Sequence, residues 1–372
     1  SMRMTSKKQT SFGLEELFDP YARITQNYKG SLKFLKAAKN TNLYDFAKLA
    51  KNYHFAVYNP LSSASTIQKH HDVYYTKLEG FCTNIITKMK QLEEFETGER
   101  HDDYVTTVNG LKLTTEGVNP YEFVRDYYDV LFCDVVNEVV DKRFREACGI
   151  TFLHFLEEID YNGKWTDGGS CPEKGSIVVD VGGGYGFFAL LALQLGAKKV
   201  YVFEPNTEAR NIIIKNRELN GYTKDEMVIY PYALGDKPRT TYLMYKTGFP
   251  QTSTLRDIPP DTHFYIKQNR EKVEIITFDM FYQRLKNDSK NEKAHIDFIK
   301  IHTNGSENEV VKGATYYLNY NDSNNLADFA INTSSNSQTY KNCKSTFDEV
   351  THPYLHTRRW AKMHSVCDKY HG

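Results

Sequence analysis

The spacing of apolar residues divides the chain into two parts. In the first part they recur every three or four positions, which is the spacing of one helix face. This spacing predicts helices over residues 14–18, 32–38, 43–53, 73–89 and 121–144. In the second part, short continuous apolar runs indicate the buried strands of an α/β domain. A stretch rich in glycine, 161–175, separates the parts, so we expect a mostly helical region over 1–165 and an α/β domain over 166–372.

The apolar face of residues 121–144 is the broadest in the helical region. Asn119-Pro120 is a suitable start for a helix, and Gly149 is a suitable stop. A face of this width needs a partner surface, so we predict that the helix packs onto the α/β domain. Its apolar members are Phe123, Val124, Tyr127, Tyr128, Leu131, Val135, Val139 and Phe144.

Three other segments carry weaker signals. Residues 104–115 alternate in polarity around Asn109-Gly110, which predicts a β-hairpin within the helical region. Residues 326–332 form a candidate strand of the α/β domain. Residues 354–366 fit either a late strand or a terminal helix.

The segment 177–196 is the most informative part of the chain. It begins with an apolar run that ends in Asp180. The turn that follows contains Gly182, Gly183, Gly184 and Gly186. An apolar stretch comes next, so the segment predicts a buried strand, a tight turn and a helix. A second apolar run, 199–203, ends in Glu204 and completes a strand–helix–strand unit, in which ligands bind beyond the carboxyl ends of the strands.

The glycine turn suits a ligand that has a ribose but no phosphate. The dinucleotide spacing G-x-G-x-x-G requires a glycine where the chain has Phe187, and no Gly-Lys-Ser/Thr phosphate loop follows. Glu204 can accept hydrogen bonds from both hydroxyls of a ribose, and Asp180 is placed to meet an ammonium group. S-adenosylmethionine combines these two groups, so we predict it as the cofactor. An α/β turn with chance glycines is the alternative interpretation.

Several blocks of the α/β part resemble the FkbM family of methyltransferases, and they occur in the same order as in that family. The blocks lie at 200–206, 211–221, 232–236, 276–279, 296–301, 305–307 and 311–314. The resemblance implies a Rossmann-like class I methyltransferase domain with a central, mostly parallel sheet. It also implies an O-methyltransferase that uses S-adenosylmethionine to methylate a hydroxyl of a sugar, a glycan or a small natural product.

The resemblance also implies which residues contact the cofactor. The cofactor turn would consist of Asp180, Gly182, Gly184 and Gly186. Glu204 would hold the ribose, and Tyr232 and Ala233 would lie beside the adenine.

One block departs from the family's pattern at the place of the chemistry. The family reads Lys-Ile-Asp-Val-Glu-Gly-Ala-Glu, whereas residues 300–307 read Lys-Ile-His-Thr-Asn-Gly-Ser-Glu. The strand-tip acid is therefore replaced by His302 and the first glutamate by Asn304, while Glu307 is retained. We predict these three residues as the catalytic set, with His302 as the general base. A structural histidine and a metal-ligand set are the alternatives, but one His with one Asn is a poor metal set and we expect no metal.

Two other functions stay open. Loss of the strand-tip acid is compatible with a methyltransferase-like module that no longer catalyses and serves as a binding or scaffold platform. An RNA ribose 2′-O-methyltransferase is the second alternative. It would use a Lys-Asp-Lys-Glu set, of which Lys300 and Glu307 are present but the strand-tip aspartate is missing.

Composition narrows the partners and the compartment. The 47 basic and 47 acidic residues leave no net charge that would attract nucleic acid or an anionic membrane. No apolar run reaches membrane-spanning length. Six scattered cysteines without a C-x-x-C pair indicate a reducing compartment, so we expect a cytoplasmic protein. The expected partner is a small-molecule or glycan acceptor, whereas the sequence gives no indication of the oligomeric state.

Overall fold

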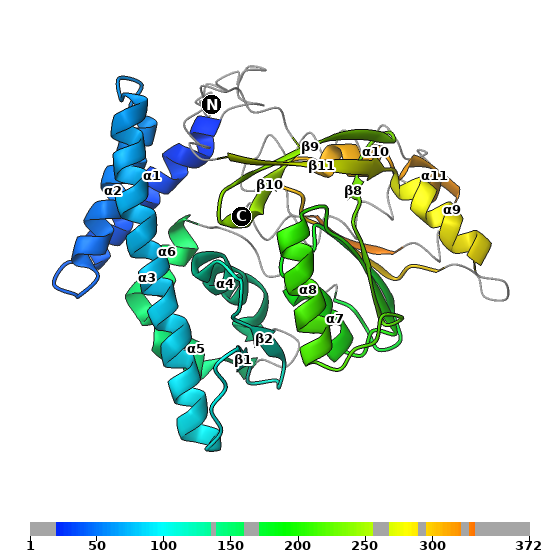
Figure 1. The fold of residues 1–372 in the computed structure, drawn as a ribbon, viewed down its shortest axis with the longest axis horizontal. Helices are drawn as coiled ribbons and strands as arrows, with labels where there is room; N and C mark the ends of the chain where they lie inside the picture. The colour runs from blue at the N-terminus through cyan, green and yellow to red at the C-terminus, as the bar shows by residue number, and fades with distance from the viewer. Residues whose placement is uncertain are drawn as a thin grey trace, which may run out of the picture.

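A computed structural model describes residues 20–134, 139–159, 171–255, 268–288, 295–320 and 327–331. The helical region and the α/β part lie side by side, with α1 to α6 on one side of the molecule (Figure 1). The predicted α/β class, with a helical region before it, is confirmed. The segments 14–18 and 354–366, most of the expected linker and the expected boundary at 165–166 lie outside the described residues.

Long helices build the N-terminal region. They are α1 (Pro20–Ala37), α2 (Tyr44–Tyr58) and α3 (Ala64–Thr97), followed later by α6 (Ile150–Ile159). The helices predicted over 32–38, 43–53 and 73–89 are confirmed as parts of the first three. Phe46 lies at their centre and packs against the rings of Tyr74, Phe81 and Phe155. None of the helices in the described ranges is long and apolar enough to cross a membrane.

The predicted hairpin is confirmed and fastens the helical region to the α/β part. Strand β1 (Tyr104–Thr106) pairs antiparallel with β2 (Lys112–Thr114). Two asparagines of helix α8 (Thr207–Leu219) and its C-cap bind the backbone of β2. Asn216 Oδ1 accepts from the N–H of Thr114 at 2.7 Å, and Asn220 bonds both the N–H and the carbonyl of Lys112.

The single helix predicted over 121–144 is wrong, because the helix ends early. Asn119 caps α4 (Pro120–Asp126), which continues as a π-helical turn, η2 (Tyr127–Leu131). The chain then forms a short ladder of β3 (Cys133–Asp134) with β4 (Val139–Val140), and α5 (Lys142–Cys148) follows. The break is stabilised by Asp141, which caps α5 and accepts a hydrogen bond from the hydroxyl of Tyr127. The contact between Asp141 and Tyr127 thus overrides the helical spacing of apolar residues over 121–144.

The predicted packing of this segment onto the α/β part is observed. Phe123 is fully buried, and its ring meets that of Phe187 at 5.4 Å, edge to face. Leu131 is also buried. One core cluster contains both residues together with apolar side chains of α7 (Phe187–Gln194), so helical region and sheet share a hydrophobic core.

The central sheet is parallel throughout its described strands. Its strands are β5 (Ile177–Val181), β6 (Lys199–Phe203), β7 (Met227–Tyr230), β12 (Phe298–Ile301) and β13 (Asp328–Ile331). Their order is β13-β12-β5-β6-β7. The chain therefore adds β6 and β7 on one side of β5 and later adds β12 and β13 on the other side of β5. Doubly wound folds bind ligands at this reversal point. The candidate strand at 326–332 is confirmed as β13, except for its end residues, which lie outside the described ranges.

Both faces of the sheet are covered, because its side chains alternate between two cores. Val178 and Val200 face the core shared with α7 and α8. Val179 and Val181 face a second core. That core also contains residues of α9 (Phe278–Asp288), α10 (Glu307–Lys312) and α11 (Thr315–Tyr320).

A second, mixed sheet contacts the loop that follows β12, at the carboxyl end of the first sheet. Its order is β10-β9-β11-β8, with β8 (Ala233–Leu234), β9 (Arg239–Lys246), β10 (Phe249–Thr254) and β11 (Gln268–Ile276). Strands β9 and β10 form a hairpin that turns at Gly248, whose φ is 77°. This hairpin brings Gln251 and Ser253 to the reversal point of the central sheet.

Candidate functional site

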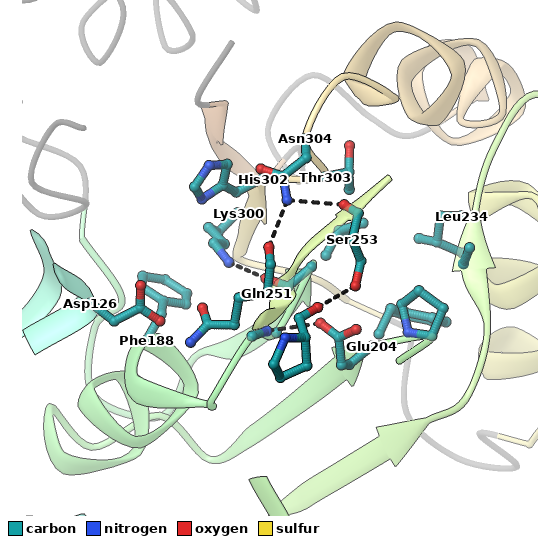
Figure 2. Close-up of a pocket in the computed structure, with 18 of the residues that line it drawn as sticks. Asp126, Phe188, Glu204, Leu234, Gln251, Ser253, Lys300, His302, Thr303 and Asn304 are labelled. Atoms are coloured by element: carbon teal, nitrogen blue, oxygen red, sulfur yellow. Dashed lines mark hydrogen bonds between the residues drawn. The ribbon is translucent and has the colours of Figure 1, made fainter. Parts of the chain in front are cut away.

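A cavity opens at the carboxyl ends of β5, β6 and β12, where the strand order reverses (Figure 2). It contains about 1110 Å³ of empty space, open solvent at its mouth included. Three parts of the chain line it: the strand tips and glycine turn of the central sheet, the β8–β10 part of the second sheet, and α4 with η2 of the helical region. The helical region therefore contributes a wall of the cavity.

Gly182 passes between two strand tips with no room for a side chain. Its N–H donates to the carbonyl of Phe203 at 2.9 Å, and its φ is 83°. A Cβ on this residue would lie 1.9 Å from the carbonyl oxygen of His302. The glycine is therefore required both by its conformation and by the close approach of β12.

The other glycines of the turn serve different purposes. Gly184 lines the cavity, and a Cβ there would lie 2.7 Å from Oε1 of Gln251. Gly186 does not line the cavity; it precedes α7 with a φ of 80°, and a Cβ there would press on Ile213 at 3.0 Å. Of the predicted cofactor glycines, Gly182 and Gly184 face the cavity, whereas Gly186 allows α7 and α8 to pack closely.

Glu204 follows β6 and lines the cavity as expected. Its Oε2 accepts from the N–H of Gly184 at 2.9 Å, and its Oε1 accepts from the N–H of Asn206 at 2.8 Å. Each carboxylate oxygen has a second lone pair, so the side chain can still accept two hydroxyl hydrogen bonds. Burial raises the pKa of Glu204 to about 7, although the two backbone N–H groups act in the opposite direction.

Tyr232 and Ala233 come after β7, which is the neighbour of β6 in the sheet. Both line the cavity, at the point where the chain leaves β7 and enters β8. Tyr232 stacks on Tyr230, with 6.4 Å between ring centroids. Tyr232 is thus an aromatic member of the cavity lining, and aromatic rings stack well on other planar rings.

Asp180 takes a different position from the predicted one. It is fully buried and does not line the cavity. The ammonium group that it meets belongs to Lys300, whose Nζ lies 2.7 Å from Oδ1 of Asp180 and also donates to the carbonyl of Gly182. Asp180 and Lys300 are register partners on β5 and β12. Burial raises the pKa of Asp180, and the charge of Lys300 opposes this effect.

The predicted catalytic residues lie in three different environments. His302 follows β12, is half-buried and lines the cavity. Asn304 also lines it, but its Nδ2 donates to the carbonyls of Gln251 and Ser253 at 2.9 and 3.0 Å. Glu307 is buried behind the turn, where its Oε1 accepts from the N–H groups of Thr303 and Gly305. Glu307 thus shapes the loop, and only His302 presents a titratable group from this set to the cavity.

These three residues offer no metal cluster. Among the residues that the structure describes, no group of three or more His, Cys, Asp or Glu side chains is arranged to hold a metal ion. The cavity wall near His302 instead contains Thr303 and Lys300.

The cavity includes charged residues that no sequence motif indicates. Arg125, Asp126 and Asp129 reach it from α4 and η2. Nothing in their local sequence marks them, because they lie in a segment whose spacing predicts an ordinary amphipathic helix. Gln251 was missed for a related reason: its hairpin reaches the cavity only through pairing with β11.

A buried carboxyl connects the three walls. Glu122 of α4 lies 2.7 Å from the hydroxyl of Tyr185 in the glycine turn, and its Oε1 accepts from the N–H of Gln251. The Tyr185 hydroxyl also accepts from the N–H of Asn119. Burial raises the pKa of Glu122 from 4.5 to about 8. The group is therefore largely protonated at neutral pH.

Replacing Glu122 with glutamine should change how stability depends on pH. Between about pH 5.5 and 7 the unfolded glutamate is ionised while the folded one keeps its proton. Its stabilising contribution is present below the unfolded pKa and is lost as pH rises through the folded pKa. Over that interval we expect wild type to lose about 2 kcal/mol relative to Glu122→Gln, measured by urea unfolding. The surface variant Glu116→Gln should follow wild type, and parallel curves for Glu122→Gln would contradict the assignment.

Comparison with known proteins gives a distant structural similarity. No family model and no curated protein matches the chain. Among solved structures, the chain is similar to the methyltransferase FkbM from Methylobacillus flagellatus KT, with 14% sequence identity and a TM-score of 0.34. The match covers 59% of this chain and 52% of that one, so the chain spans about half the length of that methyltransferase.

Proposed function

We propose that the chain is an S-adenosylmethionine-dependent methyltransferase that acts on a hydroxyl group of a sugar, a glycan or a small natural product. The observation that carries the proposal is the position of Glu204 in the cavity. Its carboxylate lies at the tip of β6, beside a turn whose glycines present only backbone to the cavity. This combination suits a ribose held against the strand ends of a doubly wound sheet.

The residues of the cavity fit the proposed cofactor. Glu204 would accept the ribose hydroxyls, and Tyr232 and Ala233 would lie along the adenine. Gly182 and Gly184 leave the backbone bare, and the clash that a Cβ would meet at either position shows how narrow this passage is. When bound, S-adenosylmethionine supplies a methyl group activated by its sulfonium.

The chain's own contribution to the transfer would be positioning and proton removal. His302 stands at the strand tip that faces the cavity and would accept the proton of the acceptor hydroxyl. General-base assistance of this kind is worth about 10²–10⁴-fold in rate. Thr303 lines the same end of the cavity and can orient the acceptor by hydrogen bonds. Alignment alone can lower the barrier by several kcal/mol, roughly 7–11 at the extreme.

A non-catalytic binding module is the second candidate, and one observation favours it. Asn304 is tied to the backbone of β10 and Glu307 is turned into the loop, so the strand tip presents only His302 for catalysis. The RNA methyltransferase alternative receives no comparable support, because Lys300 is engaged by Asp180 and no aspartate stands at the strand tip.

The first test is a calorimetric titration of the whole chain. We expect S-adenosylmethionine to bind and NAD not to bind, because the turn lacks the dinucleotide spacing. Adding sugar and small-molecule hydroxyl acceptors should then produce S-adenosylhomocysteine. Binding without turnover would favour the non-catalytic module. Binding of NAD in place of S-adenosylmethionine would contradict the proposed function.

A further inference from the structure

The amino-acid tail of the proposed cofactor needs a binding site other than Asp180. The tail carries an α-ammonium and an α-carboxylate, so it is best held by an acid and a base side by side. Asp180 was expected to take the ammonium. Its carboxylate is instead fully buried, lies outside the cavity lining and is neutralised by Lys300 at 2.7 Å.

The position of Glu204 fixes the direction in which the tail would run. With the ribose at the tip of β6 and the adenine beside Tyr232 and Ala233, the rest of the ligand has to cross the glycine turn toward β5 and β12. Figure 2 shows Glu204 and Leu234 on one side of Gln251, and Asp126 and Phe188 on the other. The tail therefore points toward Asp126.

Asp126 and Arg125 offer the required pair of charges at that end. Both line the cavity, and their side chains are only 17% and 13% exposed. Arg125 Nη2 lies 3.3 Å from Asp126 Oδ1, so the two charges are neighbours. The other oxygen of Asp126 approaches the glycine turn: a Cβ on Gly184 would lie 3.7 Å from its Oδ2. The carboxylate thus stands beside the turn that would carry the cofactor.

We propose that Asp126 and Arg125, at the end of α4, hold the zwitterionic tail of S-adenosylmethionine: Asp126 binds the α-ammonium and Arg125 the α-carboxylate. The inference rests on the proposed function and extends it, since the helical region becomes part of the cofactor site. Cofactor binding then depends on α4 being docked against the glycine turn, which Phe123 and Tyr185 secure through Phe187 and Glu122.

Two probes separate the tail from the nucleoside. S-adenosylhomocysteine contains the amino-acid tail, whereas 5′-methylthioadenosine has the same nucleoside and sulfur without it. By calorimetry on the full chain, we expect Asp126→Asn to weaken the binding of S-adenosylhomocysteine roughly 10- to 100-fold, because a hydrogen bond between charged groups is lost. Binding of 5′-methylthioadenosine should stay within about twofold of wild type, because this probe makes no contact with Asp126.

Further variants keep the test decisive. Arg125→Gln should show the same selective loss, and it replaces Asp126→Asn if that variant does not fold. Asp129→Asn removes another carboxylate from the cavity wall and should have no selective effect. Equal weakening of both probes, no weakening of either, or the same selective loss in Asp129→Asn would overturn the inference. If wild type binds neither probe, the proposed function itself fails, and the inference with it.

Discussion

Gly182→Ala is expected to destabilise the protein by roughly 4 kcal/mol or more and to abolish cofactor binding. The added Cβ would lie 1.9 Å from the carbonyl oxygen of His302 and 2.8 Å from its carbonyl carbon. Both are backbone atoms of the residue that follows β12, so no side-chain rotation can relieve the contact. The strands β5 and β12 would have to separate at the point where the cavity opens.

Gly221→Ala is the matched control for this variant. Gly221 follows α8 with a φ of 72°, similar to the 83° of Gly182, but a Cβ there would meet nothing within 4 Å. The control therefore carries the conformational cost alone, about 1–2 kcal/mol. The free energies of unfolding in urea give the difference, which reports the clash. A Gly182→Ala variant as stable as Gly221→Ala would show that the strand tips do not approach so closely.

His302→Ala is expected to lower turnover about 100-fold or more and to leave cofactor affinity nearly unchanged. The proposed role of His302 is to take the proton of the acceptor, and no cofactor contact is assigned to it. The measurement is the rate at which S-adenosylhomocysteine forms with an acceptor that wild type methylates. His295→Ala serves as the control, because His295 lies before β12, at its other end, paired with Asp297 at 2.6 Å.

Three outcomes distinguish the interpretations of His302. Loss of turnover with intact cofactor binding supports the general base. Wild-type turnover in His302→Ala would contradict the base and leave a structural histidine in the crevice. Absence of turnover in the wild-type chain with every hydroxyl acceptor, despite cofactor binding, would favour the non-catalytic module.

Features encoded by neighbouring residues could be predicted from the sequence. The apolar runs that become β5 and β6, the glycine turn between β5 and α7, and the Asn-Gly hairpin all depend on local spacing and turn chemistry. Glu204 could be placed for the same reason, since it directly follows a clear strand. Its position in the cavity needs only the rule that parallel strands end at one edge of the sheet.

Features that depend on long-range contacts could not be predicted. Asp180 ends its strand as expected, but no local pattern indicates that Lys300 stands opposite it in the register of β12. The helix over 121–144 fails because Asp141, fourteen residues beyond Tyr127, binds its hydroxyl and starts a new helix. Arg125 and Asp126 become cavity residues only because α4 docks against the glycine turn. The side chains proposed here to hold the cofactor's tail thus carry no sequence signal of their own.

The most direct measurement of the central claim is the affinity for S-adenosylmethionine in wild type, Glu204→Ala and Glu208→Ala. Glu204 would hold the ribose, so its loss should weaken binding about tenfold or more, which corresponds to about 1.4 kcal/mol or more. Glu208 lies four residues on, in the first turn of α8 outside the cavity lining, and its removal should leave the affinity unchanged. Tight binding by wild type, selectively lost in Glu204→Ala, is the predicted result. Equal affinity in all three proteins, or no binding by wild type, would contradict the account.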